Sequence, residues 1–406
     1  MRVLFITWDG PHLTYLESLF LPILAGLRDH GFEFDVLQFT WGERESPPGA
    51  KAACEHAGMG YRRVETWRRP RPFGPFLSAL AGSRQIIRAA KKFGSEMLMP
   101  RSILPGLAVL AARRALPLPI LYDADGLAAD ERVDFAGLSP RSATYRLLRR
   151  VEDRMVGAAK ANIVRTGFAA EILAERAGAP RSQFFVAPNG RDPLIFSPGD
   201  HRQRRSTRTA LGVPEAAPLI VYAGSVGGKY DTARIGTFAR AVQQLRPETR
   251  LLVLTGEPEA ARPLILGETP GLEPKSIFMR AAPADVARYL AAGDIGTAFI
   301  RPTFSMRAAA AIKTSEYLLC GVPVVGAPAV GENSAALSGG VFFDEAIGDA
   351  GLARLFTDQI LPNRERLRSQ ARAIGVAEFS LDRSIEAYAA ALNFAVQESR
   401  SGVGGR

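Results

Sequence analysis

A lysine and a glutamate with helical spacing stand just before an apolar strand in the second half of the chain. The segment Lys313 to Val325 reads KTSEYLLCGVPVV, and its Lys313 and Glu316 share one helical face. At the beginning of a helix, unpaired amides and the macrodipole favour anions. A lysine there could hold a diphosphate while a carboxylate accepts hydrogen bonds from ribose hydroxyls. The pattern predicts a nucleotide-sugar site, and its alternative is a glutamate that merely faces solvent.

A glycine-rich loop follows a predicted strand earlier in the same half. The sequence YAGSVGGKYD, Tyr222 to Asp231, leaves the strand and enters a helix, and its glycines let the backbone approach a phosphate closely. It differs from a Walker A loop because Ala223 occupies the first glycine position and Tyr230 replaces the serine or threonine that would bind magnesium. We therefore predict a phosphate-contacting turn, with a plain strand-to-helix turn as the alternative.

Acidic residues and one histidine follow strands of the first half. The loop YDADGLAADERVD, Tyr122 to Asp134, follows the fourth predicted strand and contains Asp123 and Asp125. Two aspartates that alternate at a strand end could hold magnesium, but no histidine or further spaced ligand accompanies them, so we predict no metal site. His12 follows the first strand in a loop expected to face the cleft. It is a candidate functional residue, and the alternative is that it only packs in the turn.

The composition is that of an ordinary globular protein. A chain of 406 residues, 47% hydrophobic and 23% charged, is long enough for two cores of usual domain size, and its net charge of +10 favours an anionic partner. Two cysteines and four histidines support neither a disulfide framework nor a structural zinc site. The apolar run at the beginning is too short for a signal peptide, and no segment has the length of a membrane span. We expect a cytoplasmic protein.

Strand and helix patterns alternate along the whole chain. Short β-branched and aromatic runs are separated by Ala/Leu/Arg segments with helical spacing, which is typical of parallel α/β units. A polar, charged stretch at 196–218 separates two sets of strands, so we predict two doubly wound Rossmann-like domains that face a cleft. The boundaries are expected at 1–198 for the first domain and 199–380 for the second. The strands are predicted at Val3–Thr7, Phe34–Phe39, Met97–Met99, Ile120–Asp123, Asn162–Arg165, Phe184–Ala187, Leu219–Ala223, Leu251–Thr255, Ser276–Met279, Ile295–Ile300, Val322–Val325 and Val341–Phe343.

Several motifs resemble the GT-B retaining glycosyltransferases of family 4. The stretch Lys313 to Val325 resembles their C-terminal signature, in which a glutamate-bearing helix precedes a small-residue turn and a Pro-Val-Val strand. Pro188-Asn189-Gly190, followed by Phe196 and Pro198, resembles their interdomain connection. The resemblance covers nearly the whole chain. It implies a donor-binding second domain, an acceptor-binding first domain, and a last helix at 381–406 that crosses back to the first domain and ends in a frayed tail.

The resemblance also implies roles for individual residues. Lys229 and Lys313 would stabilise the departing diphosphate, with no cofactor and no metal required. A carboxylate after the fourth strand would accept the proton of the acceptor hydroxyl. The implied catalytic residues are His12, Asp123, Asp125 and Lys313, and the implied donor-binding residues are Gly10, Gly224, Ser225, Lys229, Gly256, Arg301, Ser305, Lys313 and Glu316.

The chain departs from the family pattern at two positions. Ala308 stands eight residues before Glu316, where the family usually has a glutamate that contacts the donor sugar. Asp125 takes the place of the arginine in the family's Asp-x-Arg-Gly form. Two alternatives remain open: a nucleotide-sugar epimerase of the same fold and, because of Ala308, a non-catalytic protein that binds a sugar nucleotide without turnover.

One stretch of the first domain combines arginines with aromatic residues. Tyr61 to Phe76, YRRVETWRRPRPFGPF, suits an anionic membrane interface, with a solvated charged face as its alternative. No RNA- or DNA-binding motif accompanies the charge, so no nucleic-acid partner is predicted. We expect a glycan or lipid-linked acceptor in bacterial cell-surface polysaccharide or glycolipid synthesis, and a peripheral position on the inner face of the cell membrane.

Overall fold

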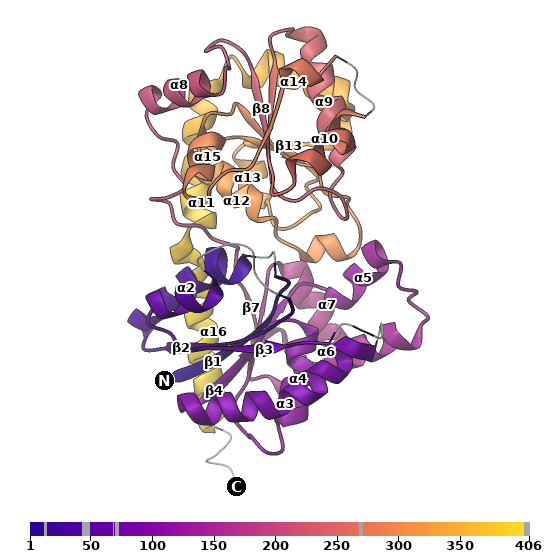
Figure 1. The fold of residues 1–406 in the computed structure, drawn as a ribbon, viewed down its shortest axis with the longest axis vertical. Helices are drawn as coiled ribbons and strands as arrows, with labels where there is room; N and C mark the ends of the chain where they lie inside the picture. The colour runs from indigo at the N-terminus through magenta and orange to yellow at the C-terminus, as the bar shows by residue number, and fades with distance from the viewer. Residues whose placement is uncertain (12–13, 43–48, 68, 70–72, 268–270, 402–406) are drawn as a thin grey trace. The chain divides into compact units, whose positions relative to one another are not determined.

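The computed structural model describes residues 1–406 except 12–13, 43–48, 68, 70–72, 268–270 and 402–406. The chain divides into two compact units (Figure 1). Unit 1 comprises Met1–Pro188, Arg307–Ala309 and the C-terminal segment from Asp382, and unit 2 comprises Asn189–Met306 and Ala310–Leu381. Residues 189–198, which the sequence analysis placed in the first domain, are thus grouped with unit 2.

Unit 1 is built on parallel strands in the order β3-β2-β1-β4, continued by β5-β6-β7. Isolated bridges between Leu98 and Ile120 and between Arg101 and Asp123 link β4 to the β5 side. The central strands are almost wholly buried, as expected for parallel strands covered on both faces, although β2 includes the buried polar residues Asp35, Gln38 and Thr40. The strands are β1 (Arg2–Trp8), β2 (Glu33–Thr40), β3 (Tyr61–Glu65), β4 (Met97–Pro100), β5 (Leu121–Asp125), β6 (Ala161–Val164) and β7 (Phe184–Val186).

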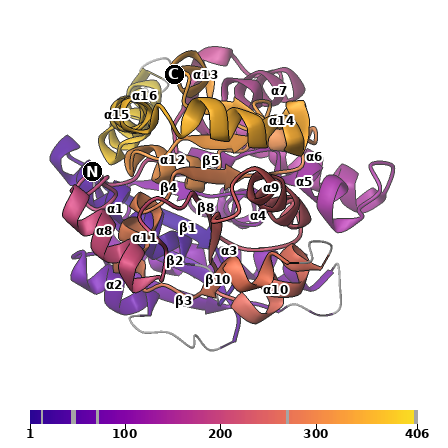
Figure 2. The same ribbon diagram turned by 90° about the horizontal axis from the view of Figure 1, so that it is seen from above.

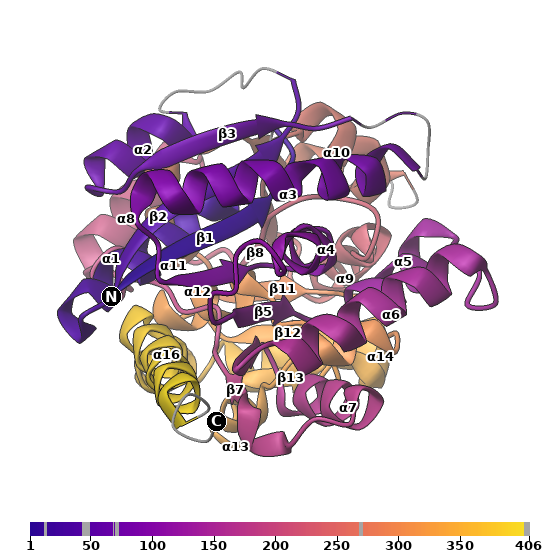
Figure 3. The same ribbon diagram turned by 90° about the horizontal axis from the view of Figure 1, so that it is seen from below.

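All helices of unit 1 except α16 connect these strands, and α16 is the last helix of the chain. Helix α3 packs against α4, and α4 packs against α6, while α1 and α2 contact β2 and β3 (Figure 3). The helices are α1 (Leu21–Gly26), α2 (Ala50–His56), α3 (Phe73–Phe93), α4 (Ile103–Ala112), α5 (Ala128–Ala136), α6 (Ala143–Ala158), α7 (Gly167–Ala177) and α16 (Leu381–Ser401).

Strand β3 is the one strand of the described chain that the sequence patterns did not predict. It lies at the edge of the sheet and pairs with β2 alone. Its Arg62 donates to Gln85 on α3, and its Arg63 forms an ion pair with Glu65. Charged side chains are common on edge strands because they oppose pairing with another chain, and they hide the alternation by which a strand is recognised in sequence.

Unit 2 has a single parallel sheet with the strand order β10-β9-β8-β11-β12-β13. The chain order reverses between β8 and β11, which is the arrangement of a doubly wound Rossmann-like sheet. The predicted α/β class with parallel sheets is therefore confirmed. The strands are β8 (Leu219–Ala223), β9 (Arg250–Leu254), β10 (Ser276–Met279), β11 (Ile295–Ala298), β12 (Val324–Gly326) and β13 (Phe342–Asp344).

Two groups of helices cover the sheet of unit 2. Helix α9 packs against α10 and α14, and α12 packs against α11 and α15. The two groups lie on opposite sides of β8 (Figures 1 and 2). The helices are α8 (His201–Ala210), α9 (Thr232–Leu245), α10 (Pro258–Leu266), α11 (Pro283–Ala291), α12 (Ile312–Leu319), α13 (Ser334–Ser338), α14 (Gly348–Leu355) and α15 (Arg364–Phe379).

Candidate functional site

The side chain of Lys313 is a buried cation in unit 2. It is the second residue of α12 and is only 6% exposed. Its ammonium lies 4.0 Å from the ring centroids of both Tyr222 and Tyr230, and among the described residues it has no hydrogen-bond partner. Two aromatic faces stabilise a cation by their quadrupoles, but they do not replace the hydrogen bonds that the ammonium gives up when it leaves water.

Burial has a clear effect on the protonation of this lysine. It lowers the pKa of Lys313 from 10.5 to about 7, with Glu316 opposing the change and Lys229 adding to it. An anionic ligand beside the ammonium would restore the charged form, because an opposite charge favours protonation. The geometry and the lowered pKa both indicate a position that an anion would complete.

The loop after β8 passes directly over the Lys313 ammonium. Gly224 has a φ of +131°, and a Cβ at that position would lie 3.2 Å from the lysine Nζ. Only glycine adopts this backbone conformation readily, and it also lets the main chain approach the cation. Gly224 and Lys313, both predicted to bind the donor, therefore lie next to each other, and their contact with a donor stays a prediction.

The same loop brings a second lysine and an arginine together. The amide of Arg301, after β11, donates to the carbonyl of Lys229 at 3.0 Å, and Tyr230 forms a bridge with Ile300. The loop is thereby fixed across the ends of β8 and β11. Ser225 is exposed in this loop, and its carbonyl accepts a hydrogen bond from the Tyr222 hydroxyl.

Glu316 has a partner that sequence reasoning missed. The Nε atom of Arg191 lies 3.0 Å from Oε1 of Glu316, and both side chains are mostly buried. Burial raises the pKa of Glu316, while Arg191 and Lys313 pull it down. Arg191 directly follows the Pro-Asn-Gly motif, and this basic residue beside a motif already singled out was the available signal. The predicted contact of Glu316 with ribose hydroxyls stays a prediction.

Three other residues that were predicted to bind the donor lie in different parts of the structure. Gly256 is exposed two residues after the end of β9, next to the buried Thr255. Ser305 is buried in a short 3-10 helix at Ser305–Ala308, with its hydroxyl 3.5 Å from that of Thr303. Gly10 follows β1 in unit 1. None of these positions by itself decides whether the residue contacts a ligand.

Ala308, where the family usually has a glutamate, is fully buried and groups with unit 1. A Cβ at Gly126 would lie 3.2 Å from the Ala308 carbonyl oxygen, so the two backbones are in close contact. A glutamate at this position would enter an apolar cluster that includes Ala124 and Leu127. Alanine therefore suits the local packing.

The carboxylates of unit 1 form a connected ionic network. Asp123 is completely buried and receives the Arg165 guanidinium at 2.7 and 2.9 Å and the Tyr388 hydroxyl at 2.6 Å. Burial opposes the charge of Arg165, but Asp123, Tyr388 and Asp125 raise the pKa of its guanidinium well above the usual value. Such a paired, buried carboxylate favours a structural role over the predicted proton transfer.

Asp125 is the more accessible of the two predicted catalytic aspartates. Its side chain is 37% exposed, and its backbone has a φ of 67°, which is uncommon outside glycine. Its carboxylate lies 2.5 Å from Arg101 and 3.2 Å from Arg165. Arg101 also lies 3.8 Å from the buried Asp9. Neither arginine was predicted from the sequence as a site residue, although each directly follows a strand.

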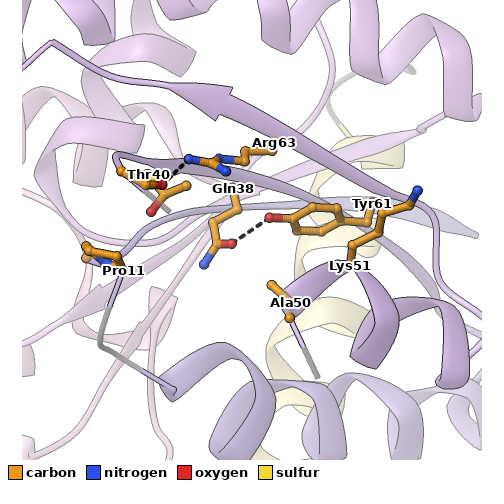
Figure 4. Close-up of a pocket in the computed structure, with 10 residues that line it drawn as sticks. Pro11, Gln38, Thr40, Ala50, Lys51, Tyr61 and Arg63 are labelled. Atoms are coloured by element: carbon orange, nitrogen blue, oxygen red, sulfur yellow. Dashed lines mark hydrogen bonds between the residues drawn. The ribbon is translucent and has the colours of Figure 1, made fainter. Parts of the chain in front are cut away.

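A cavity of about 300 Å³ lies beside this network in unit 1 (Figure 4). Gly10, Gln38, Lys51, Tyr61 and Arg63 contribute to its lining. The Tyr61 hydroxyl donates to the Gln38 amide oxygen at 2.8 Å, and the Gln38 amide nitrogen lies 3.4 Å from Asp9. Polar groups of the cavity are thus continuous with the ionic network. The predicted catalytic His12 lies outside the described residues.

Comparisons with known proteins identify the type of chain. The family described as glycosyl transferase 4-like domain matches residues 18–190, and the family described as glycosyl transferases group 1 matches residues 217–353. A D-inositol 3-phosphate glycosyltransferase of Stackebrandtia nassauensis is 28% identical over 287 residues, which are 66% of this chain and 61% of that protein. The match therefore spans less than two thirds of that relative's length.

Solved structures share the fold over nearly the whole chain. HepE of Anabaena, in complex with UDP, superposes with a TM-score of 0.70 at 19% identity and covers 97% of this chain and 100% of its own. WaaG, a glycosyltransferase involved in lipopolysaccharide biosynthesis, gives a TM-score of 0.67 at 17% identity and covers 96% and 98% of the two chains. These similarities show the predicted GT-B fold.

Proposed function

Because the chain belongs to the glycosyltransferase group 1 family, we propose that it moves a sugar from a nucleotide-diphosphate sugar to a hydroxyl acceptor with retention of anomeric configuration. The observation that carries this proposal is the buried Lys313 ammonium, which lies under the Gly224 turn without a hydrogen-bond acceptor among the described residues. A diphosphate at this turn would supply the missing acceptor atoms and the compensating charge.

The donor side of the proposal assigns a task to each nearby group. Lys313 and Lys229 stabilise the negative charge that grows on the departing diphosphate, and such preorganised cations are usually the largest contribution to this kind of catalysis. Arg301 extends the cationic surface at the end of β11. Glu316 accepts hydrogen bonds from the ribose, and Arg191 holds its carboxylate in place and opposes the rise of its pKa that burial causes. Solved structures of HepE contain UDP and UDP-glucose, which supports a donor of this chemical class.

The acceptor side is assigned to unit 1. The cavity lined by Gln38, which contacts Asp9, offers the hydroxyl of Tyr61 and the amide of Gln38, which suit a polyhydroxylated molecule. Asp125 is the accessible carboxylate of the network and is the stronger candidate for contact with the acceptor hydroxyl. We place this chemistry in bacterial cell-surface polysaccharide or glycolipid synthesis, with a glycan or lipid-linked acceptor.

Part of the proposal concerns an anionic membrane surface on the inner face of the cell membrane. Within the described residues, no helix combines the length and apolarity that a bilayer span requires. Helix α3 instead exposes Phe73, Leu77 and Leu80 at 64%, 50% and 47%, followed by the exposed Arg84 and Arg88. An apolar stripe continued by cations suits the boundary between acyl chains and anionic headgroups.

Vesicle binding tests the membrane part. We expect sedimentation with phosphatidylglycerol vesicles and little with phosphatidylcholine vesicles, and a loss of sedimentation in the Leu77→Ser, Leu80→Ser double variant. The matched control replaces Leu245 and Leu264 of unit 2, each 48% exposed, with serine. Equal loss in both double variants, or none in either, would contradict the assignment to α3.

Calorimetric titration tests the donor assignment. The native protein is titrated with uridine, guanosine and thymidine diphosphate sugars, and then compared with Lys313→Ala, Glu316→Ala and the control Lys275→Ala. Lys275 precedes β10, at the amino end of the strand, and should not affect binding. Tight binding of one donor that both site variants lose supports the proposal. The donor assignment fails if nothing binds or if all variants bind equally.

The two alternatives predict different products. An epimerase would convert the bound donor to a changed nucleotide sugar without acceptor, and a non-catalytic protein would bind the donor without turnover. Incubating the bound donor alone and then with lipid-linked or glycan acceptors separates them from transfer. Only acceptor-dependent release of the nucleoside diphosphate, with the anomeric configuration of the new bond unchanged, agrees with a retaining transferase.

A further inference from the structure

Tyr317 is buried at the point where two neighbouring strands of unit 2 separate. Strands β8 and β11 pair in register only at Ile220 with Ile295 and at Val221 with Gly296. Both strands continue beyond this pairing, β8 to Ala223 and β11 to Ala298. The strand order reverses here, and such switch points open the crevice in which α/β sheets bind ligands.

The Tyr317 hydroxyl occupies the gap between the strands. The amide of Ala223 donates to the tyrosine oxygen at 2.9 Å, and the same oxygen lies 3.4 Å from the carbonyl oxygens of Val221 and Thr297. One hydroxyl thus accepts from β8 and can donate to β8 or β11. It satisfies backbone groups that the separating strands no longer pair with each other, and such buried groups are costly when unpaired.

The ring of Tyr317 is fixed as firmly as its hydroxyl. A Cβ at Gly296 would lie 2.6 Å from ring carbons, so the ring packs directly on a glycine that leaves room for it. Tyr317 is completely buried. Burial also raises the pKa of Tyr317 far above its usual value, so the hydroxyl keeps its proton and remains able to donate.

The residue that Tyr317 holds is the last one before the Gly224 turn. Ala223 begins this turn, and Lys313 stands four residues before Tyr317 on α12, with its ammonium 3.2 Å from where a Cβ of Gly224 would lie. A lysine and a tyrosine with this spacing lie on one helical face. Helix α12 therefore contributes both the Lys313 ammonium and the Tyr317 hydroxyl, which holds the backbone at Ala223, next to the turn that lies close to this ammonium.

We propose that Tyr317 is a positioning residue, whose hydroxyl fixes the Gly224 turn at the distance from Lys313 that binds the diphosphate of the donor. The inference rests on the proposed function, because the donor is the ligand being positioned. It adds a residue whose action on the donor is indirect, through the backbone amide of Ala223.

Removing the hydroxyl alone tests the inference. Tyr317→Phe keeps the ring on Gly296 and leaves the Ala223 amide without its acceptor. The probes are UDP, GDP and dTDP, and the one that the native protein binds is titrated into the variant. We expect its Kd to rise about tenfold, which corresponds to ~1.4 kcal/mol. An unchanged Kd would overturn the inference.

A matched control separates positioning from loss of stability. Thr249 is also completely buried, its hydroxyl donates to the Arg246 carbonyl, and it lies before β9, at the opposite end of the strands. Thr249→Val should lower the Tm without changing the Kd. If Thr249→Val weakens binding as much as Tyr317→Phe does, the role of Tyr317 is merely structural.

Hydrogen exchange gives a second readout that needs no ligand. In Tyr317→Phe, amides from Gly224 to Tyr230 should exchange faster than in the native protein, while Thr249→Val should leave them unchanged. Failure of the native protein to bind any of the three diphosphates would remove the proposed function. The exchange comparison still decides whether Tyr317 fixes the turn. If these amides exchange equally fast in Tyr317→Phe and in the native protein, Tyr317 does not fix the turn.

Discussion

The two units place charges at the carboxyl ends of their strands in opposite ways. In unit 1, the guanidiniums of Arg101 and Arg165 are met by the carboxylates of Asp123 and Asp125, and the buried charges compensate one another. In unit 2, the buried Lys313 ammonium faces aromatic rings and has no hydrogen-bond acceptor among the described residues.

This difference separates a group that maintains the fold from one that we propose to bind a ligand. Removing one partner of a compensated buried ion pair is strongly destabilising, because the other charge is then left buried without compensation. An uncompensated buried cation is costly as it stands and becomes favourable only when an anion arrives. The two kinds of site therefore predict opposite responses to substitution.

The largest effect is expected in the compensated network. Asp123→Asn would leave the Arg165 guanidinium buried without its main partner and should lower the free energy of unfolding by about 3 to 5 kcal/mol. Urea unfolding followed by circular dichroism measures it. Tyr388→Phe removes only one hydrogen bond of the same carboxylate and should cost about 1 kcal/mol. Equal stability of Asp123→Asn and the native protein would show that this network is not structural.

The uncompensated lysine should respond in the opposite way. Lys313→Met removes a buried charge and keeps much of the apolar stem, so the free energy of unfolding should stay the same or rise. Donor binding should weaken by about 1.5 to 3 kcal/mol for each charge-assisted hydrogen bond lost. Urea unfolding and calorimetric titration of the same preparation measure both quantities. If Lys313→Met is strongly destabilised yet binds donor normally, Lys313 has a structural role and does not bind the donor.

The pH dependence sharpens the comparison further. The pKa of Lys313 is lowered from 10.5 to about 7, so unfolding of the unliganded protein takes up a proton between these pH values. The contribution of Lys313 to stability should therefore rise with pH across this window. Donor affinity should fall as pH rises above about 7, by at most about tenfold per pH unit, because the ligand needs the charged ammonium.

Donor titrations at pH values below and above about 7 check the pH dependence of donor affinity, with Lys313→Met as the reference. The variant should lose the pH dependence that belongs to this group. Glu316 and Lys229 are the other ionisable groups that influence the lysine, and single replacements of each show whether the change belongs to Lys313 itself. Donor affinity that rises with pH would contradict the sign given above.

The smallest effect is expected at the turn over the lysine. Gly224→Ala places a Cβ close to the ammonium at a φ of +131°, and the strained backbone should cost about 1 kcal/mol of stability. Donor affinity should also fall, because the turn must shift away from Lys313. Gly212→Ala, at a φ of +66° with no neighbour within 4 Å, is the control that has strain without the contact. Equal donor affinity in Gly224→Ala and Gly212→Ala would contradict a role of the Gly224 turn in donor binding.

Much of the fold could be read from the sequence because parallel strands are buried on both faces. Runs such as Leu219–Ala223 and Val3–Thr7 are almost purely apolar, and each corresponds to a strand of the structure. Strand β3 could not be read in this way because its arginines belong to a sheet edge. The pairing of Lys313 with Gly224 in one site was also predicted, since both belong to recognisable motifs.

What the sequence determined by itself was the set of apolar strands, the glycine turn and the basic helix start, because these depend on residues that are neighbours along the chain. Which charges are compensated depends on contacts between residues that are far apart in the sequence. Arg165 reaches Asp123 and Tyr388 across 42 and 223 residues of sequence, and Tyr317 reaches Ala223 across 94. Whether a buried charge has a partner depends on distances of a few ångströms between such remote residues. These distances cannot be derived from the spacing of the residues along the chain.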